Sequence, residues 1–208
     1  MDDRARFFAV CDVSHETMQD IDAYVRLLIK WQARINLVGP ATLDTLWSRH
    51  ILDSYQLISL IPDSATRIVD LGSGGGLPGL IVAIAMKARG RGRVTLVESN
   101  GKKASFLRIV IQSLDLPATV CQQRIETAVS TLGPTDVVTA RALAGLEQLL
   151  SWCAPLLKTG SVGLFHKGRD LDKEIVEAAI SWRFTALRQP SIVEQESWIV
   201  QVMDLAPR

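Results

Sequence analysis

Five glycines gather within the twelve-residue segment VDLGSGGGLPGL at 69–80. Gly74, Gly76 and Gly79 have the G-x-G-x-x-G spacing of loops that hold a dinucleotide pyrophosphate at a helix N-terminus. Asp70 stands directly before this loop, and its charge would repel a pyrophosphate. An acid here suits a ligand with a cationic group, such as the α-ammonium of a methionine moiety.

A second acid, Glu98, ends the next hydrophobic run. An acid at this point can accept hydrogen bonds from both hydroxyls of a ribose. S-adenosylmethionine carries a ribose and an α-ammonium group, so Asp70 and Glu98 together favour it over a dinucleotide. Two alternatives stay open: a dinucleotide site, or a loop whose glycines only turn the chain while Asp70 caps the helix.

Arg141 and several other basic residues are the candidates for contacts with a second partner. Arg141 ends a later hydrophobic run, where its guanidinium could donate to guanine O6 or to a phosphate; the alternative is a structural ion pair. With a net charge of only +1, binding of a nucleic acid requires a local basic patch. The basic residues that follow predicted strands are Lys102, Lys103, Arg124, Lys167 and Arg169. Each one alone is an ordinary solvated charge, but their shared position predicts such a patch.

Helices are predicted for the first part of the chain, residues 1–61. Ser14 is a suitable N-cap, and apolar residues recur at helical spacing until Gly39 and Pro40 end the pattern. A second amphipathic stretch runs over 43–58 and closes at Pro62. Within it His50 is expected to be a partly buried, satisfied histidine.

From residue 66 onward the pattern alternates between strands and helices. Strands are predicted at 67–72, 93–99, 118–123, 136–141 and 161–167, helices at 79–88, 102–114, 146–157 and 171–180, and a terminal hairpin at 183–189 and 197–205. This order predicts an α/β, Rossmann-like fold: a mostly parallel, doubly wound sheet with a C-terminal antiparallel hairpin and an N-terminal helical cap. We expect a single domain over 1–208, with 1–61 as an extension of the ligand-binding core at 66–208. Ligands of such sheets bind at the carboxyl ends of the strands.

Composition excludes several classes of protein. No apolar run is long enough for a membrane helix, and the N-terminus opens with acids, unlike a signal peptide. Cys11, Cys121 and Cys153 are widely spaced and predict core thiols of a reducing cytoplasm. His15 and His166 form no metal-ligand constellation, so no metal is expected.

Five segments, in order, resemble the bacterial small-subunit ribosomal RNA guanine-N7 methyltransferase family, RsmG or GidB. They are LLIKWQARINLVGP at 27–40, RHILDS at 49–54, RIVDLGSGGGLPGLIVAI at 67–84, LVESNGKKASFL at 96–107, and TARALA at 139–144 with FHKG at 165–168. The departures are small: Glu98 stands where the family often has aspartate, and LVGP replaces a turn that often has threonine after NL. The last forty residues match loosely.

The resemblance implies a cytoplasmic, S-adenosylmethionine-dependent class I methyltransferase. Its substrate would be N7 of one guanine of 16S rRNA in the 30S subunit, at position 527 of the usual rRNA numbering. The family's cofactor contacts correspond here to Gly72, Leu77, Ile125, Glu126 and Arg141, beside the Asp70, Gly74 and Glu98 of the loop and second strand. No sequence feature demands more than a monomer.

The absence of other motifs agrees with this target. Guanine N7 has a lone pair and no proton, so methyl transfer needs placement and no general base. The chain lacks the Asn/Asp-Pro-Pro-Tyr cluster of exocyclic-amine methyltransferases and the Pro-Cys nucleophile of pyrimidine C5 methyltransferases. Two other hypotheses are a NAD-dependent oxidoreductase and a non-catalytic RNA-binding factor.

Overall fold

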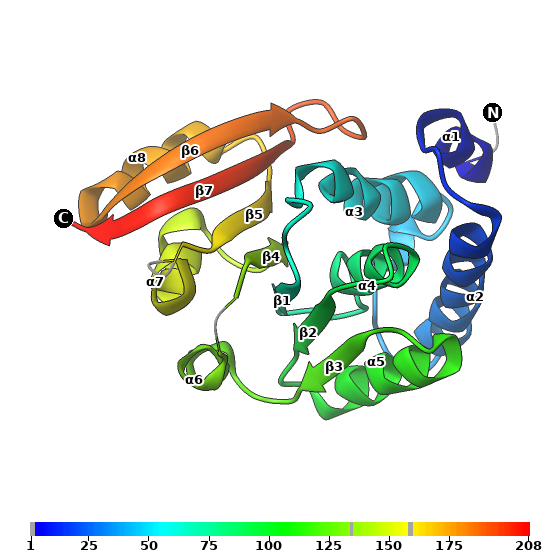
Figure 1. Ribbon diagram of the computed structural model, residues 1–208. Coiled ribbons are helices and arrows are strands. Elements are labelled where there is room, and N and C mark those ends of the chain that lie inside the picture. Colours follow the sequence, from blue (N-terminus) through cyan, green and yellow to red (C-terminus); the bar gives the residue numbers. More distant parts are fainter. Residues whose placement is uncertain (1–2, 134, 158–159) are drawn as a thin grey trace.

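The hydrophobic runs form one seven-stranded sheet in the computed structural model, which describes residues 3–133, 135–157 and 160–208 (Figure 1). The strand order is β3-β2-β1-β4-β5-β7-β6, with the first five strands parallel and the last two antiparallel to their neighbours. The strands are β1 (Arg67–Leu71), β2 (Arg93–Val97), β3 (Ala118–Cys121), β4 (Val137–Arg141), β5 (Val162–Lys167), β6 (Trp182–Pro190) and β7 (Trp198–Pro207). The predicted parallel sheet with a C-terminal hairpin is therefore confirmed.

Helices cover both faces of this sheet, as a doubly wound fold requires. In Figure 1, α2, α4 and α5 lie on one face, and α6, α7 and α8 lie on the other. The α-helices outside the 47–60 segment are α1 (Asp3–Val10), α2 (His15–Gln32), α4 (Gly79–Ala88), α5 (Gly101–Leu114), α6 (Ile125–Thr131), α7 (Leu146–Leu157) and α8 (Leu171–Ser181). Each face has its own hydrophobic cluster, and the N-terminal helices share the cluster of α4 and α5.

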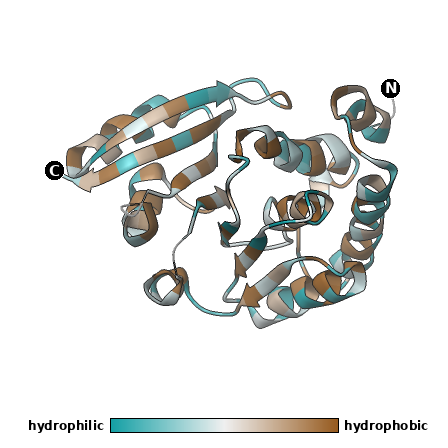
Figure 2. Ribbon diagram, viewed as in Figure 1, coloured by the Kyte–Doolittle hydropathy of each residue, from teal (hydrophilic) through white to brown (hydrophobic). Residues whose placement is uncertain are grey.

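The most buried helix is α4, which directly follows the glycine-rich loop. Every residue from Gly79 to Met86 is buried, and Figure 2 shows the hydrophobic colour along this helix. The sequence predicted its bounds correctly because its apolar run is continuous and begins at a glycine after a proline. No helix within the described residues is long and apolar enough to cross a membrane.

The end of α2 differs from the prediction. Ser14 is its N-cap, as predicted, and its hydroxyl accepts from Thr17 N at 3.2 Å. The helix ends at Gln32, however, well before Gly39. The Gln32 amide oxygen accepts from the backbone N–H of Leu37 and Val38, at 2.8 and 3.0 Å. This side chain satisfies the backbone of a turn, so the chain leaves the helix early.

The second amphipathic stretch is helical, as predicted, but its winding changes along its length. After the short 3-10 turn η1 (Pro40–Thr42), a π-helical segment η2 (Trp47–Leu52) passes into α3 (Asp53–Tyr55) and the 3-10 segment η3 (Gln56–Leu60). The carboxylate of Asp3 accepts from the amides of Trp47 and Ser48 at its start, at 2.7 and 3.1 Å. Single π-turns are frequent at functional sites, which directs attention to η2.

Two helices, α1 and α6, were not predicted as separate elements. α1 carries one buried residue, Phe7, which packs against the rings of Trp47 and Tyr55 at centroid distances of 5.7 and 5.3 Å. α6 has seven residues and no side-chain cap, so its sequence lacks the usual start signal. Of the predicted core thiols, Cys153 is buried, whereas Cys11 and Cys121 are half-buried.

Candidate functional site

The glycine loop leaves the end of β1 and turns back into α4. Its glycines differ in what surrounds them. A Cβ on Gly79 would fall 2.3 Å from a Leu96 methyl group. Among the residues that the structure describes, a Cβ on Gly74 would have only the backbone oxygen of Gly72 within 4 Å, at 3.7 Å. Packing therefore requires Gly79, while Gly74 leaves an open face of backbone. Such a face lets a ligand approach the loop closely.

The N-terminal helical extension holds the glycine loop in place. The hydroxyl of Tyr24, on α2, is buried and donates to the Gly75 carbonyl oxygen at 2.8 Å. A Cβ on Gly75 would fall 3.0 Å from the carbonyl oxygen of Leu37. Within the loop, Leu77 is buried and precedes a cis peptide bond to Pro78. The helical extension thus forms part of the support of the site.

Asp70 lies beneath this loop and is 0% exposed. Its Oδ1 accepts from the Thr139 hydroxyl at 2.7 Å, and its Oδ2 has no hydrogen-bond partner among the described residues. A Cβ on Gly79 would fall 2.5 Å from Oδ2, so the carboxylate sits at the N-terminal end of α4. There the helix dipole favours its negative charge, but α4 begins after Pro78 without a side-chain cap, so the structure does not show Asp70 as the helix cap. Direct contact with a ligand cation stays a prediction.

The burial of Asp70 predicts a pH dependence of stability. Burial raises the pKa of this carboxyl to about 6, against the lowering effect of its hydrogen bond from Thr139. The folded state therefore holds the proton more tightly than the unfolded chain, and the resulting stability is fully present below about pH 4 and lost as pH rises through about 6. Denaturant unfolding across this range should show wild type losing stability relative to Asp70→Asn. A pH-independent difference between the two proteins would contradict the assignment.

Glu98 follows β2 and holds the opposite side of the loop. Its Oε2 accepts from Gly74 N at 2.9 Å and its Oε1 from Asn100 N at 2.7 Å. Asn100 in turn caps α5, its side chain accepting from the amides of Lys102 and Lys103 at 3.0 and 3.1 Å. The carboxylate is thus fixed beside the open face of Gly74, where it has further acceptor sites for hydroxyl groups.

Two other predicted cofactor contacts begin α6, directly after β3. Ile125 is half-buried and packs against the cluster of α6 and α7, while Glu126 is exposed in the first turn. Both lie at the carboxyl edge of the sheet, next to the strand that Glu98 follows. Gly72, another predicted cofactor contact, packs against the segment that follows β4. A Cβ on it would fall 2.6 Å from a methyl group of Leu143.

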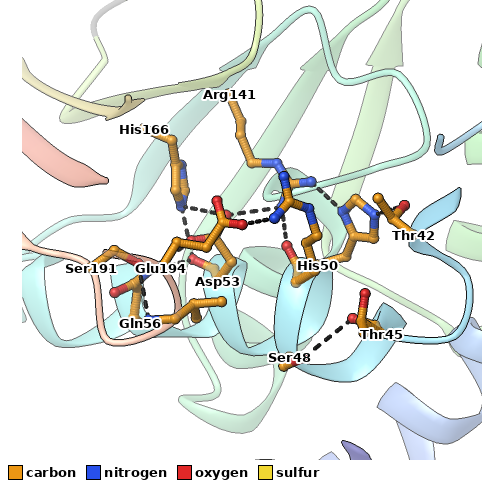
Figure 3. Close-up of polar contacts among 12 residues, drawn as sticks. Thr42, Thr45, Ser48, His50, Asp53, Gln56, Arg141, His166, Ser191 and Glu194 are labelled. Atoms are coloured by element: carbon orange, nitrogen blue, oxygen red, sulfur yellow. Dashed lines mark hydrogen bonds and ion pairs between the residues drawn. The ribbon is translucent and has the colours of Figure 1, made fainter. Parts of the chain in front are cut away.

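Arg141 ends β4 and lies at the centre of a polar cluster (Figure 3). Its side chain is 15% exposed, and its Nη1 donates to Asp53 Oδ2 at 3.1 Å and to the Arg49 carbonyl oxygen at 3.3 Å. Its Nη2 donates to Nδ1 of His50. Among the described residues the Nε–H has no partner, so part of the donor fork is free for a ligand.

The partners of His50 fix its tautomer. An arginine can only donate, so Nδ1 of His50 must accept and Nε2 must carry the proton. That Nε2–H donates to the Thr42 hydroxyl at 2.6 Å, and the hydroxyl donates to the Gly39 carbonyl oxygen at 2.7 Å. Burial, followed by the charge of Arg141, lowers the pKa of His50 to about 4. The expected buried, satisfied histidine is confirmed, and it holds Arg141 in place.

A cavity of about 370 Å³ opens beside this cluster. Its lining comes from η1 and η2, the ends of β4 and β5, and the loop between β6 and β7. The charged residues in the lining are Arg49, Asp53, Arg141, Lys167 and Glu194, joined by His50 and His166. Arg49 and Glu194 form an ion pair at the rim. The volume is sufficient for a nucleobase and lies within the range of small-molecule sites.

Asp53, His166 and Glu194 were not predicted as site residues. The ring Nε2–H of His166 donates to the Asp53 carbonyl oxygen at 2.8 Å and lies 3.7 Å from Asp53 Oδ2. The spacing of Arg49, His50 and Asp53 on one helical turn was the available signal for Asp53. No such signal exists for His166 and Glu194, because their partners lie more than a hundred positions away along the chain.

The predicted RNA-contact residues fall into two groups. Lys102 and Arg124 are exposed and Lys103 is half-buried, all at the carboxyl edge of the sheet. Lys167 requires a correction, because its side chain is only 5% exposed and forms an ion pair with Glu174. Its Nζ also donates to the Ala144 carbonyl oxygen, at 2.8 Å. This ammonium supports the loop after β4 and does not face solvent.

Comparison with known proteins gives matches over nearly the whole chain. The family model described as rRNA small subunit methyltransferase G matches residues 17–200. A Ribosomal RNA small subunit methyltransferase G from Methylobacterium radiotolerans is 51% identical, covering 98% of this chain and 96% of that protein. Its counterpart from Bartonella henselae is 46% identical, covering 93% and 89%. Among solved structures, a Precorrin-6y C5,15-methyltransferase from Geobacter metallireducens has a TM-score of 0.54 at 14% identity, covering 81% and 91%; it shares the fold.

Proposed function

This chain belongs to the rRNA small subunit methyltransferase G family, and from that premise we propose that it methylates N7 of one guanine of 16S rRNA, at position 527. It is a class I methyltransferase, and its cofactor is S-adenosylmethionine. Family membership sets aside the NAD-dependent oxidoreductase hypothesis. The choice of guanine and of its N7 is the finer part of the proposal, and it is supported by the cavity beside Arg141.

The residues of the loop fit this cofactor. Gly74 offers an open backbone face, Glu98 offers carboxylate oxygens for the ribose hydroxyls, and Asp70 places negative charge under the methionine end. Gly72, Leu77, Ile125 and Glu126 complete the proposed binding surface, the last two at the adenine end. Bound S-adenosylmethionine supplies an electrophilic methyl group on its sulfonium.

The observation that carries the proposal is the register of β1 and β4. Leu71 lies opposite Ala140 in the neighbouring strand. The next residues, Gly72 of the loop and Arg141, therefore start from adjacent positions at the same edge of the sheet. The cofactor loop therefore adjoins the polar cavity at the switch point of the sheet. Arg141 can donate to guanine O6 or to a phosphate from its free N–H groups, in addition to any contact it makes with the cofactor.

Placement accounts for the chemistry at N7. The lone pair of guanine N7 is already nucleophilic, so the chain needs no general base. Its residues have to orient the base and keep water out, and a well-aligned bound pair can contribute roughly 7–11 kcal/mol toward the barrier. His50 contributes by fixing Arg141, because its neutral Nδ1 accepts from the guanidinium.

We propose that residues 1–208 act as one domain, a monomer in the cytoplasm, with the 30S subunit or its 16S rRNA as partner. The helices of 1–61 support this because they share a hydrophobic cluster with α4 and α5. Lys102, Lys103 and Arg124 are proposed to hold the RNA backbone, so binding should weaken with rising salt.

Replacing Glu98 by glutamine should weaken S-adenosylmethionine binding by about 10-fold to 100-fold, because hydrogen bonds from ribose hydroxyls to a charged acceptor become neutral ones. Calorimetric titration measures the change. Glu177→Gln, an exposed glutamate on α8, is the control and should bind like wild type. Equal affinities for the Glu98 variant and wild type would remove Glu98 from the ribose site.

The proposed reaction is tested with methyl-labelled S-adenosylmethionine and 30S subunits that lack the modification. Borohydride and aniline treatment then cleaves RNA at 7-methylguanosine. One new cleavage at position 527 is the expected result, and subunits that already carry the modification are the control. Label without cleavage would exclude N7 as the target, and absence of label with folded protein would favour the non-catalytic binding factor.

A further inference from the structure

Asp53 is a half-buried carboxylate in the lining of the cavity, and its contacts leave acceptor capacity free. Its side chain is 18% exposed. Its Oδ1 accepts from the Gln56 amide at 2.7 Å and its Oδ2 from Arg141 Nη1 at 3.1 Å. A carboxylate has about four acceptor sites, so these two hydrogen bonds occupy roughly half of them. The carboxylate therefore retains acceptors for a ligand.

Arg141 and Asp53 lie side by side in Figure 3, and both belong to the lining of the cavity. The guanidinium of Arg141 can offer an N–H donor, and the carboxylate of Asp53 beside it can offer its remaining acceptor sites. A guanine has the complementary sequence along its Watson–Crick edge: the O6 acceptor, then the N1–H and N2–H₂ donors. Adenine presents a donor where guanine has O6, so it would place N–H against N–H at Arg141.

We propose that Asp53 reads the N1–H and N2–H₂ groups of the target guanine while Arg141 donates to O6. This inference rests on the proposed function and adds to it the residue that selects the base. Enzymes that modify a base commonly take it out of its stack into a cavity and read its Watson–Crick edge there. In this arrangement N7 lies on the side of O6 away from Asp53, so the pair holds the base without covering the reacting nitrogen.

Glu194 is the other carboxylate that could make such contacts, and its position makes it the weaker candidate. It lies in the loop between β6 and β7, its side chain is 40% exposed, and it pairs with Arg49 at the rim. Asp53 is held by Gln56, Arg141 and His166 together. A fixed and largely desolvated carboxylate discriminates hydrogen-bond donors more strongly than an exposed one.

The test compares guanine with inosine at the target position. Inosine keeps N7, O6 and N1–H and lacks only the 2-amino group. 30S subunits are reconstituted from ligated 16S rRNA that carries either base, and kcat/KM for methyl transfer is measured on both. For wild type we expect guanine to be preferred by about 10-fold to 100-fold. A wild-type ratio near one would overturn the proposal.

Variants then assign the preference to one side chain. In Asp53→Asn the guanine-to-inosine ratio should fall to within about threefold of one, because the amide offers fewer acceptors. Asp53→Glu should restore part of the ratio, and Glu194→Gln, the matched control, should keep the wild-type value. Because each ratio is taken within one protein, a general loss of activity from a displaced Arg141 cancels.

Different results would refute the proposed function and the proposed role of Asp53. Wild type that gives no cleavage at 7-methylguanosine on the guanine substrate would refute the proposed function, and the role of Asp53 would fall with it. Wild type that methylates N7 while Asp53→Asn retains full discrimination would refute only the role of Asp53. If Asp53→Asn does not fold, the wild-type ratio and Asp53→Glu decide the question.

Discussion

Replacing Arg141 by lysine should lower kcat/KM for rRNA methylation by about 100-fold or more, because the preorganised donor that we propose for the target base is lost. Lysine keeps a positive charge beside Asp53, so an ion pair between residues 141 and 53 is retained. What lysine lacks is the planar fork that bonds Asp53, the Arg49 carbonyl and His50 at once and still offers donors to a ligand.

The measurement is steady-state methyl transfer to 30S subunits, with S-adenosylmethionine binding followed separately by calorimetry. Arg183→Lys, at an exposed arginine of β6, is the matched control and should retain wild-type activity. Affinity for the cofactor separates a loss of base placement from a loss of cofactor contact. Activity of Arg141→Lys within threefold of wild type would show that the fork is not needed, and only the charge is.

Replacing Gly76 by alanine should destabilise the protein by about 3 kcal/mol or more, through strain in the backbone and overpacking. Gly76 has a φ of +93°, and a Cβ on it would fall 2.2 Å from a methyl group of Leu80 and 3.1 Å from one of Leu107. Because α4 begins beneath this loop, the displaced leucine would disturb the most buried helix of the fold.

Gly160 provides a matched control for this substitution. It has a nearly equal φ of +89°, but a Cβ on it would have no heavy atom of the described residues within 4 Å. Gly160→Ala should therefore show the backbone cost alone, about 1 kcal/mol. Denaturant unfolding of both variants separates the two contributions. Equal losses of stability would mean that crowding at Leu80 contributes nothing, contrary to the geometry of the loop.

The sequence predicted most of the sheet because its signals are local. Each parallel strand is a short apolar run, and the continuous run of α4 fixes that helix. The predicted end of α2 was wrong because the side chain of Gln32 accepts hydrogen bonds from the backbone of the following turn. Hydrophobic periodicity carries no information about such a contact. The π-helical winding of η2 is invisible for the same reason.

The site was predictable only where its residues stand at strand ends. Asp70, Glu98 and Arg141 could be chosen by position, since the carboxyl ends of parallel strands meet at one edge. Their partners could not, because His166 reaches Asp53 across 113 positions of the chain. Burial can also remove a basic side chain from the surface where its position in the sequence predicts it. Lys167 is the last residue of β5, at the same edge as the other basic residues, yet its ammonium is enclosed by Glu174 and the Ala144 carbonyl.

One wall of the polar cavity depends on contacts between segments that lie far apart along the chain. Gln56 donates to the Ser191 hydroxyl at 3.2 Å and accepts from Ile192 N at 3.1 Å, contacts that span 135 and 136 positions. Contacts of such long range form late, since a large loop must close first. A chain still under synthesis cannot complete this wall until the β6–β7 hairpin has left the ribosome. Nascent or truncated chains that lack this hairpin should therefore lack a complete cavity and, with it, methyl transfer.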